Sequence, residues 1–199
     1  MNKKRKNVRN WIILLLVILL GAGGAAIVGR DVGQPQPVLT QALAETTENG
    51  SEVFTMDFSN EPENVIYLAG GCFWGIEHLM ASIPGVIDAE SGYANGRNPE
   101  DANYQTICSR DTGFRETVRV EYDPGQVSLD ALLMAYFYVI DPTVQNRQGN
   151  DIGTQYQTGV YYTNDAAKET VERIAAIERS RSPEFHVEIG PLLNYYPAE

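Results

Sequence analysis

Two hydrophobic patterns alternate along the chain after residue 62. The apolar run Val65-Ile66-Tyr67-Leu68-Ala69 is rich in strand-forming residues and predicts a buried strand. Between residues 73 and 83 the apolar positions have helical spacing, and Pro84-Gly85 ends the pattern. The two patterns then recur toward the C-terminus. They predict further strands at residues 86–93, 115–122, 159–163 and 185–189, and further helices at residues 104–108, 129–140 and 167–177.

The order of these elements is β-α-β, then β-α, then β-α-β. Helices that alternate with strands cover a sheet, so we expect an α/β (α+β) fold, a two-layer sandwich with a mixed sheet and a ferredoxin-like core. We expect this domain to span residues 63–199. Its longest connection, residues 146–156, is rich in hydrogen-bonding side chains and is either solvated or functional.

One strand of this domain breaks its own polarity pattern. In the segment 115–122, Val118, Val120 and Tyr122 share the apolar face, and Glu116 falls on the same face. A carboxylate buried there should have a raised pKa, which suits a proton donor near neutral pH. The alternative is that Glu116, close to the end of the strand, frays into water.

The N-terminal part of the chain predicts a membrane anchor. Residues 1–30 form a basic N-terminus followed by an uncharged apolar segment at residues 11–29, just long enough to span a bilayer. The basic residues precede the span, so the positive-inside rule places the rest of the chain outside the cytoplasm. A cleavable signal peptide, followed by secretion, is the alternative. Residues 31–62 have little hydrophobic periodicity and predict a flexible linker.

Charge and composition exclude several function classes. The formal net charge is −11, and the chain beyond residue 30 carries nine basic against 26 acidic residues, a net charge of −17. Such a surface repels nucleic acid, so we expect no nucleic-acid partner. His78 and His186 have no metal-ligand spacing to either cysteine, and we expect no metal site.

The candidate chemistry centres on Cys72. The stretch Gly70-Gly71-Cys72-Phe73-Trp74-Gly75 lies where the first strand ends and a helix begins. A thiol there faces the positive end of the helix, which stabilises a thiolate. The alternative, about equally frequent for such a cysteine on local evidence alone, is a small buried hydrophobe beside core aromatic residues.

Several stretches together carry a family resemblance. They are Gly71-Cys72-Phe73-Trp74-Gly75, Gly92-Tyr93-Ala94, residues 104–109, Thr112-Gly113 followed by Glu116, Tyr122-Asp123-Pro124, Asp141-Pro142-Thr143 and residues 146–156. On these residues the chain from residue 64 to residue 199 resembles the type A peptide methionine sulfoxide reductases, which act on the S epimer of methionine sulfoxide. The resemblance includes none of residues 1–60.

The resemblance implies a role for each of five residues. Cys72 would be the nucleophile that attacks the sulfoxide sulfur and is left as a sulfenic acid when methionine leaves. Glu116 would donate a proton to the sulfoxide oxygen, and Tyr104 and Tyr156 would hydrogen-bond that oxygen. Asp151 would order the site and position the substrate. Sulfoxide oxygen leaves poorly until it is protonated, so neutral acidic donors are what this reaction needs.

The resemblance also implies that Phe73 and Trp74 hold the methyl group of the substrate. Three positions depart from the usual pattern of the family. Phe114 stands where a histidine usually follows the Thr-Gly, Ile140 stands where a histidine is frequent, and Asn95 replaces a glycine. Phe114 is the departure that could alter the pocket or the pKa of Glu116.

Many members of the family continue into a tail that carries resolving cysteines, whereas this sequence ends at Glu199. We therefore expect a one-cysteine form with no bound cofactor, in which a thioredoxin-like protein or a small dithiol reduces the sulfenic acid. Cys108 is expected to be a buried free thiol.

The expected enzyme is a monomeric peptide-methionine (S)-S-oxide reductase that repairs oxidised proteins or reduces free methionine sulfoxide. It would be tethered to the membrane through residues 11–29, with the catalytic domain outside the cytoplasm. Two alternatives remain: a cysteine-based peroxidase or acyl-transfer enzyme, and a binding module for oxidised methionine that cannot recycle.

Overall fold

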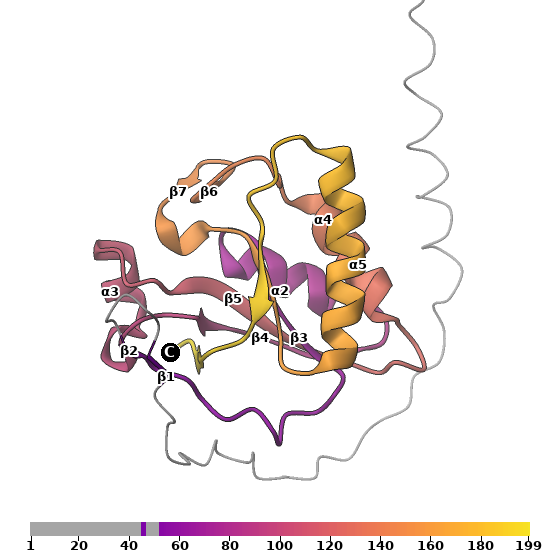
Figure 1. Cartoon of the computed structure of the whole chain (residues 1–199), viewed down its shortest axis with the longest axis horizontal. Coiled ribbons are helices and arrows are strands. Elements are labelled where there is room, and N and C mark those ends of the chain that lie inside the picture. The colour runs from indigo at the N-terminus through magenta and orange to yellow at the C-terminus, as the bar shows by residue number, and fades with distance from the viewer. Residues whose placement is uncertain (1–44, 47–51) are drawn as a thin grey trace, which may run out of the picture. The chain divides into compact units, whose positions relative to one another are not determined.

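The computed structural model describes residues 45–46 and 52–199, and its main element is a six-stranded sheet (Figure 1). The strand order is β10-β4-β5-β3-β8-β9. The bounds of these strands are β3 Val65–Ala69, β4 Val86–Ala94, β5 Arg115–Tyr122, β8 Gly159–Tyr162, β9 Glu188–Pro191 and β10 Tyr195–Pro197. The helices are α2 Phe73–Ala81, α3 Tyr104–Ser109, α4 Leu129–Val139 and α5 Asp165–Arg181.

Shorter elements complete the described part of the chain. Two strand pairs lie outside the main sheet, and both are antiparallel. They are β1 Glu45–Thr46 with β2 Glu52–Val53, and β6 Arg147–Gln148 with β7 Asp151–Ile152. Two 3-10 helices are found at η1 Pro99–Asp101 and η2 Thr154–Tyr156.

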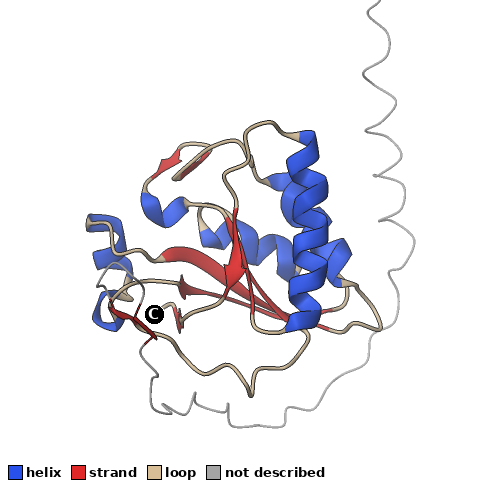
Figure 2. Cartoon of the chain, in the orientation of Figure 1, coloured by secondary structure: helices blue, strands red, loops and turns tan. Residues whose placement is uncertain are grey.

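The connectivity of the central strands is ferredoxin-like. The chain runs β3-α2-β4-β5-α4-β8, and these four strands lie in the order β4-β5-β3-β8 with every neighbouring pair antiparallel. Helix α5 then returns the chain to β9, which pairs with β8 in parallel, so the sheet is mixed as predicted. Figure 2 shows α4 and α5 side by side, and the two helices are in contact.

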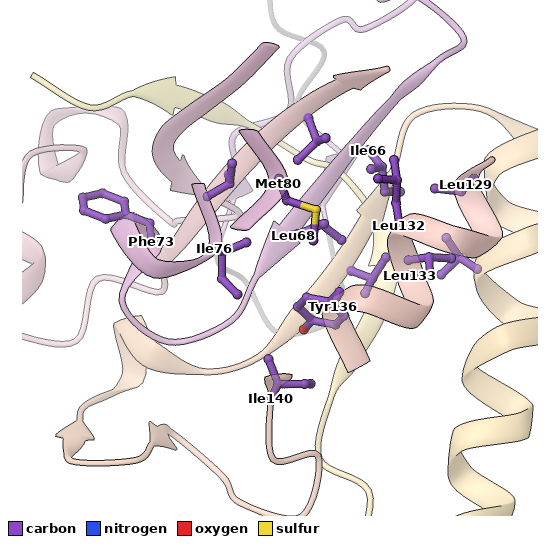
Figure 3. Packing of buried hydrophobic residues seen from close by; sticks show 14 of the residues in the cluster. Ile66, Leu68, Phe73, Ile76, Met80, Leu129, Leu132, Leu133, Tyr136 and Ile140 are labelled. Atoms are coloured by element: carbon purple, nitrogen blue, oxygen red, sulfur yellow. The ribbon is translucent and has the colours of Figure 1, made fainter. Parts of the chain in front are cut away.

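The core between the helices and the sheet fixes the end of β3. Met80 of α2, Tyr136 of α4 and Leu68 of β3 are completely buried in one cluster (Figure 3). The Tyr136 hydroxyl donates to the carbonyl oxygens of Ala69, at 2.7 Å, and Gly159, at 3.2 Å. These bonds tie α4 to β3 and β8 at the point where the chain turns toward Cys72.

The second face of the sheet is covered by irregular chain. A smaller apolar cluster lies there, formed by Val65, Tyr67, Ala69, Ala94, Tyr161, Leu192 and Tyr195, with Phe58 packed against it. The backbone N–H of Met56 donates to the Leu193 carbonyl at 2.7 Å. Both faces of β3 are therefore buried, which explains why its sequence is continuously apolar rather than alternating.

These contacts change the domain boundary expected from the sequence. The segment 54–62 falls within the predicted flexible linker, yet Phe58 packs on the sheet, and Glu61 accepts hydrogen bonds from Tyr67 and Arg119. The folded domain thus begins before residue 63. The sequence of residues 54–62 shows no hydrophobic periodicity, because this segment contacts the sheet through single side chains and backbone groups.

The predicted membrane anchor at residues 1–30 lies outside the described residues. Within residues 45–46 and 52–199, the structure contains no helix with the length and apolar character needed to cross a bilayer.

The C-terminal strands also differ from the prediction. Alternation of Phe185 and Val187 predicted a strand from residue 185, but pairing with β8 begins only at Glu188. Phe185 instead packs against Phe137 and Arg179. The tail after β9, for which no element was predicted, forms β10 and pairs with β4, extending the sheet at its other edge.

Candidate active site

Cys72 lies at the junction between β3 and α2, as the sequence predicted. It is the N-cap residue of α2, its side chain caps no backbone group, and the thiol is free and half-buried. The junction therefore leaves the sulfur free to react.

The turn before Cys72 depends on the hairpin of the long polar loop. Gly71 has a φ of +87°, and a Cβ at this position would lie 2.5 Å from Cβ of Gln148 in β6. Gln148 is fixed because its side chain accepts from the N–H of Asp141, at 2.9 Å, and donates to the Asp141 carbonyl, at 2.7 Å. The polar loop is thus packed against the cysteine turn.

We expect Gly71→Ala to lower the free energy of unfolding by about 2–4 kcal/mol, because it combines left-handed strain with a clash against Gln148. Gly149→Ala is the matched control: the φ of Gly149 is +57°, and a Cβ added at this position would have no atom within 4 Å. The control should cost only about 1 kcal/mol. Urea denaturation of both variants measures the difference, and equal losses would contradict the packing of the hairpin on the turn.

Glu116 is buried beside Cys72. Its side chain is 1% exposed on the same face of β5 as Val118 and Val120, so the alternative of a frayed strand end is wrong. Its Oε2 accepts from the backbone N–H of Phe73, the residue after Cys72, at 3.0 Å. The pKa of Glu116 is raised to about 7, mainly by burial; the Phe73 N–H opposes this rise and the Asp151 carboxylate contributes to it. Glu116 therefore holds a proton at neutral pH more readily than an exposed carboxylic acid.

Two phenols share this electrostatic environment. Burial, followed by the charge of Glu116, raises the pKa of Tyr156 to about 12. The Cys108 sulfur raises the pKa of Tyr104, with smaller effects from Glu116 and Cys72. Both hydroxyls are protonated at neutral pH and can donate hydrogen bonds to an oxygen in the site.

The polar loop brings Asp151 and Tyr156 to this site. Asp151 is exposed in β7, and its charge raises the pKa of both Glu116 and Tyr156. Tyr156 ends the 3-10 helix η2. The loop is closed by hydrogen bonds between Gly153 N and Asn146 O, at 3.0 Å, and between Asn146 N and Gln157 Oε1, at 2.6 Å. The sequence left open whether residues 146–156 are a solvated loop or a functional one, and the structure favours a functional loop.

Three aromatic rings lie together beside Cys72, and we call them the aromatic slot: Phe73, Trp74 and Tyr104. The ring centroid of Tyr104 is 6.5 Å from that of Phe73 and 6.4 Å from that of Trp74, with the planes inclined by 22° and 18°. Phe73 is buried, whereas Trp74 is 65% and Tyr104 42% exposed. The aromatic slot is therefore an apolar surface open to a substrate.

Cys108 differs from the expected buried thiol. It is free but exposed, on α3, and its sulfur is in hydrogen-bonding contact with the Tyr104 hydroxyl. The short helix α3 spans only six residues and turns the side chain outward.

The departures from the family pattern have local explanations. Asn95 has a φ of +58°, a left-handed conformation in which asparagine is tolerated where most residues are not. Its Oδ1 also accepts from the N–H of Leu193 at 2.8 Å. Phe114 is buried and packs edge-on against Tyr196, with ring centroids 5.7 Å apart.

Sequence reasoning missed two residues that contact the aromatic slot. Tyr93 belongs to a stretch that carries the resemblance but was given no role, and its ring lies 5.9 Å from Phe73. Glu199 accepts from the N–H of Tyr104, 95 positions earlier in the sequence. No local pattern reveals a contact over that separation, whereas the aromatic character of Tyr93 was a usable signal.

Within the described part of the chain, no group of three or more His, Cys, Asp or Glu side chains could hold a metal ion.

Comparison with known proteins agrees with this geometry. Residues 64–199 match the family described as "Peptide methionine sulfoxide reductase". A curated relative from Clostridium perfringens, peptide methionine sulfoxide reductase MsrA, is 45% identical over 135 residues, which cover 67% of this chain and 85% of the relative.

Solved structures show the same similarity. Methionine sulfoxide reductase A of Corynebacterium diphtheriae matches with a TM-score of 0.65 and 35% identity, covering 70% of this chain and 72% of the other. Mxr1 from Saccharomyces cerevisiae in complex with Trx2 matches with a TM-score of 0.50 and 26% identity, covering 71% and 85%. The chain therefore belongs to the peptide methionine sulfoxide reductase A family, whose members are peptide-methionine (S)-S-oxide reductases.

Proposed function

We propose that Cys72 and Glu116 carry the chemistry of methionine S-sulfoxide reduction in this protein. The observation that supports the pair is the hydrogen bond from the Phe73 N–H to Glu116, because it places a buried carboxylic acid one residue from the thiol. The pKa of Glu116, raised to about 7, gives this acid a usable proton near neutral pH.

In the proposed first step the Cys72 thiolate attacks the sulfoxide sulfur while Glu116 protonates the sulfoxide oxygen. The attack forms a bond between the Cys72 sulfur and the substrate sulfur. That bond and the sulfur–oxygen bond of the substrate then break as the protonated oxygen is transferred to Cys72, which is left as a sulfenic acid. Methionine leaves as the thioether. The net change is one thiol and one sulfoxide converted into one sulfenic acid and one thioether, with no other oxidant or reductant.

The other site residues prepare this step. Tyr104 and Tyr156 donate hydrogen bonds to the sulfoxide oxygen, which supports the negative charge that grows on it before protonation. The aromatic slot, formed by Phe73, Trp74 and Tyr104, receives the methyl group of the substrate. Asp151 keeps Glu116 protonated through its negative charge, which is the direction of its effect on the Glu116 pKa.

A thioredoxin-like protein or a small dithiol is the proposed reductant. Two thiols would reduce the sulfenic acid of Cys72 to a thiol, with release of water and formation of a disulfide in the reductant. The solved complex of the relative Mxr1 with Trx2 supports a partner of this class. The Cys72 sulfur is half-buried rather than enclosed, which leaves it accessible to such a thiol.

We further propose that residues 11–29 anchor the enzyme in a membrane with the catalytic domain outside the cytoplasm. The support is in the sequence: an uncharged apolar segment preceded by five basic residues. Its substrates would then be oxidised proteins or free methionine sulfoxide on that side of the membrane. The reductant would have to act there as well.

The proposed function predicts repeated turnover of a methionine S-sulfoxide peptide by the full chain in detergent, with dithiothreitol as the only reductant. The R epimer should not react, because its methyl group and oxygen would exchange places between the aromatic slot and the tyrosine hydroxyls. Separating the two epimers by chiral chromatography measures this selectivity. Equal consumption of both epimers would contradict the proposed arrangement.

The same reaction tests the recycling step. After one equivalent of substrate without reductant, intact mass should show one added oxygen on the protein, and a parallel sample with dimedone should instead carry a dimedone adduct on Cys72. A Cys72–Cys108 disulfide in place of that adduct would overturn reduction by an external thiol alone. A single turnover that stalls even with dithiothreitol would instead support a binding module that cannot recycle.

A further inference from the structure

We infer that Glu199 is a positioning residue for the aromatic slot: its carboxylate holds Tyr93 and Tyr104, which both pack on Phe73, and so fixes the wall that receives the substrate methyl group. The inference rests on the proposed function, since it concerns the slot next to Cys72. No role of this kind follows from the position of Glu199 in the sequence.

Both oxygens of the carboxylate are used. Oε1 of Glu199 accepts from the backbone N–H of Tyr104 at 2.9 Å, and Oε2 accepts from the hydroxyl of Tyr93 at 3.2 Å. The rings of these tyrosines lie 6.5 Å and 5.9 Å from the ring of Phe73. One side chain therefore links two aromatic residues that contact a third.

The backbone that carries Glu199 is itself fixed. Strand β10 pairs with β4 beside Tyr93, and the N–H of Ala198 donates to the Ser91 carbonyl at 2.9 Å. The Tyr195 hydroxyl donates to the Glu90 carbonyl at 2.8 Å, on the other face of the sheet. The carboxylate is thus attached to the sheet and reaches across to α3.

Tyr104 depends on this support because its backbone lies on a short helix near the surface. Its side chain is 42% exposed, and the helix that carries it spans six residues, too few to be stable alone. The Asn103 side chain caps α3 by accepting from Thr106 N at 3.0 Å, which leaves the N–H of Tyr104 for Glu199. A carboxylate is the favoured partner for an N–H at the start of a helix.

Loss of the Glu199 carboxylate should change the position of Tyr104 in the site as well as the stability of the fold. Without Glu199, Tyr104 can shift away from Phe73 and Trp74, and both the methyl-binding wall and the Tyr104 hydroxyl move with it. Displacements of about 1 Å near reacting groups cost on the order of 100-fold in rate. An effect on activity larger than the effect on folding is therefore the mark of positioning.

The test compares Glu199→Ala, Glu199→Gln and the control Glu100→Ala in the full chain. Glu100 is an exposed carboxylate just before α3, and its side chain makes no hydrogen bond or ion pair within the described residues. We expect kcat/KM for the S-sulfoxide peptide to fall about 10-fold in Glu199→Ala, mainly through a higher KM. Glu199→Gln keeps an oxygen acceptor for Tyr104 and should stay within about 3-fold of the parent, as should Glu100→Ala.

Trp74 fluorescence distinguishes positioning from stabilisation, because it would not change if Glu199 only stabilised the fold. The chain has two tryptophans, so a Trp11→Phe background leaves Trp74 as the sole indole, stacked on Tyr104. Acrylamide quenching should increase in Glu199→Ala and remain unchanged in Glu100→Ala. Tyr93→Phe removes only the hydroxyl, so it should have a smaller effect and add nothing to Glu199→Ala.

Two results would overturn the inference. One is Glu199→Ala with unchanged KM and unchanged Trp74 quenching, and the other is a loss of activity that follows the thermal melting temperature alone. Both are distinguishable from failure of the proposed function, in which the parent chain itself would not turn over the S-sulfoxide peptide.

Discussion

Replacing Cys72 by serine will lower kcat/KM for methionine S-sulfoxide by at least about 10⁴-fold, since removing an enzyme's nucleophile can cost about 10⁶-fold in kcat, as it does in a serine protease. Serine has almost the same size but a hydroxyl that stays protonated at neutral pH, and it cannot form a sulfenic acid. Cys72 caps no backbone group with its side chain, so the substitution breaks no hydrogen bond that α2 depends on. The loss should therefore occur in a protein with the parent melting temperature.

Cys108→Ser is the matched control for this prediction. Cys108 is the other cysteine of the chain, and it is exposed on α3. With dithiothreitol as reductant, turnover of the control should stay within about 3-fold of the parent, because an exogenous thiol can reach the sulfenic acid directly. Reverse-phase chromatography of the peptide measures the turnover rates of the parent and of both variants. Substantial turnover by Cys72→Ser would show that another residue is the nucleophile and would contradict the proposed site.

The parts of the site that the sequence predicted are those with a local signature. Cys72 follows a buried strand and two glycines at the start of a helix, and the structure places it at that junction. Glu116 breaks the alternation of a single strand, and the structure buries it on the predicted face. Both predictions needed only the period of a strand or helix over a few residues.

The parts that the sequence did not predict depend on contacts between distant segments. Phe54, in the predicted linker, accepts from the side chain of Asn194, 140 positions later, at 2.7 Å. Asn194 also donates to the Gly96 carbonyl at 3.0 Å, so one buried amide joins three segments. No periodicity marks such a residue, because its partners are backbone groups rather than a shared apolar face.

The long polar loop is an intermediate case. Its composition indicated function or solvation, and the family resemblance named Asp151 and Tyr156. Its packing against Gly71 through Gln148 was not predictable, because the sequence shows neither the left-handed turn nor the two hydrogen bonds that fix the glutamine. The tail strand β10 was missed for a similar reason: three residues are too few to show a period.

Glu116→Gln should lower kcat/KM by roughly 10²–10⁴-fold, the usual contribution of a general acid. The amide has the shape of the carboxyl group and keeps an oxygen that can accept from the Phe73 N–H, so the start of α2 is preserved. What it lacks is a transferable proton. Glu121→Gln, on the same strand but paired with Arg119 away from the thiol, is the matched control and should retain parent activity.

The pH dependence separates the acid from a structural role. The pKa of Glu116 lies at about 7, above the usual range for a glutamic acid, so its reactive protonated form is lost as pH rises through 7. The ratio of the parent rate to the Glu116→Gln rate should therefore fall about tenfold per pH unit above that value, because ionisation of the Cys72 thiol affects both proteins in the same way. A ratio that stays constant between pH 7 and pH 9 would contradict the assignment.

Asp151→Asn extends the same argument. The Asp151 carboxylate raises the pKa of Glu116, so removing its charge makes the ionised form of Glu116 easier to reach and lowers that pKa. The decline in rate should then begin at lower pH than in the parent, and the activity lost at pH 7 should be partly recovered at pH 6. Asp151 is exposed, so this substitution leaves the core intact. If Asp151 served only to order the loop, its loss would lower the rate equally at every pH and leave the position of the decline unchanged.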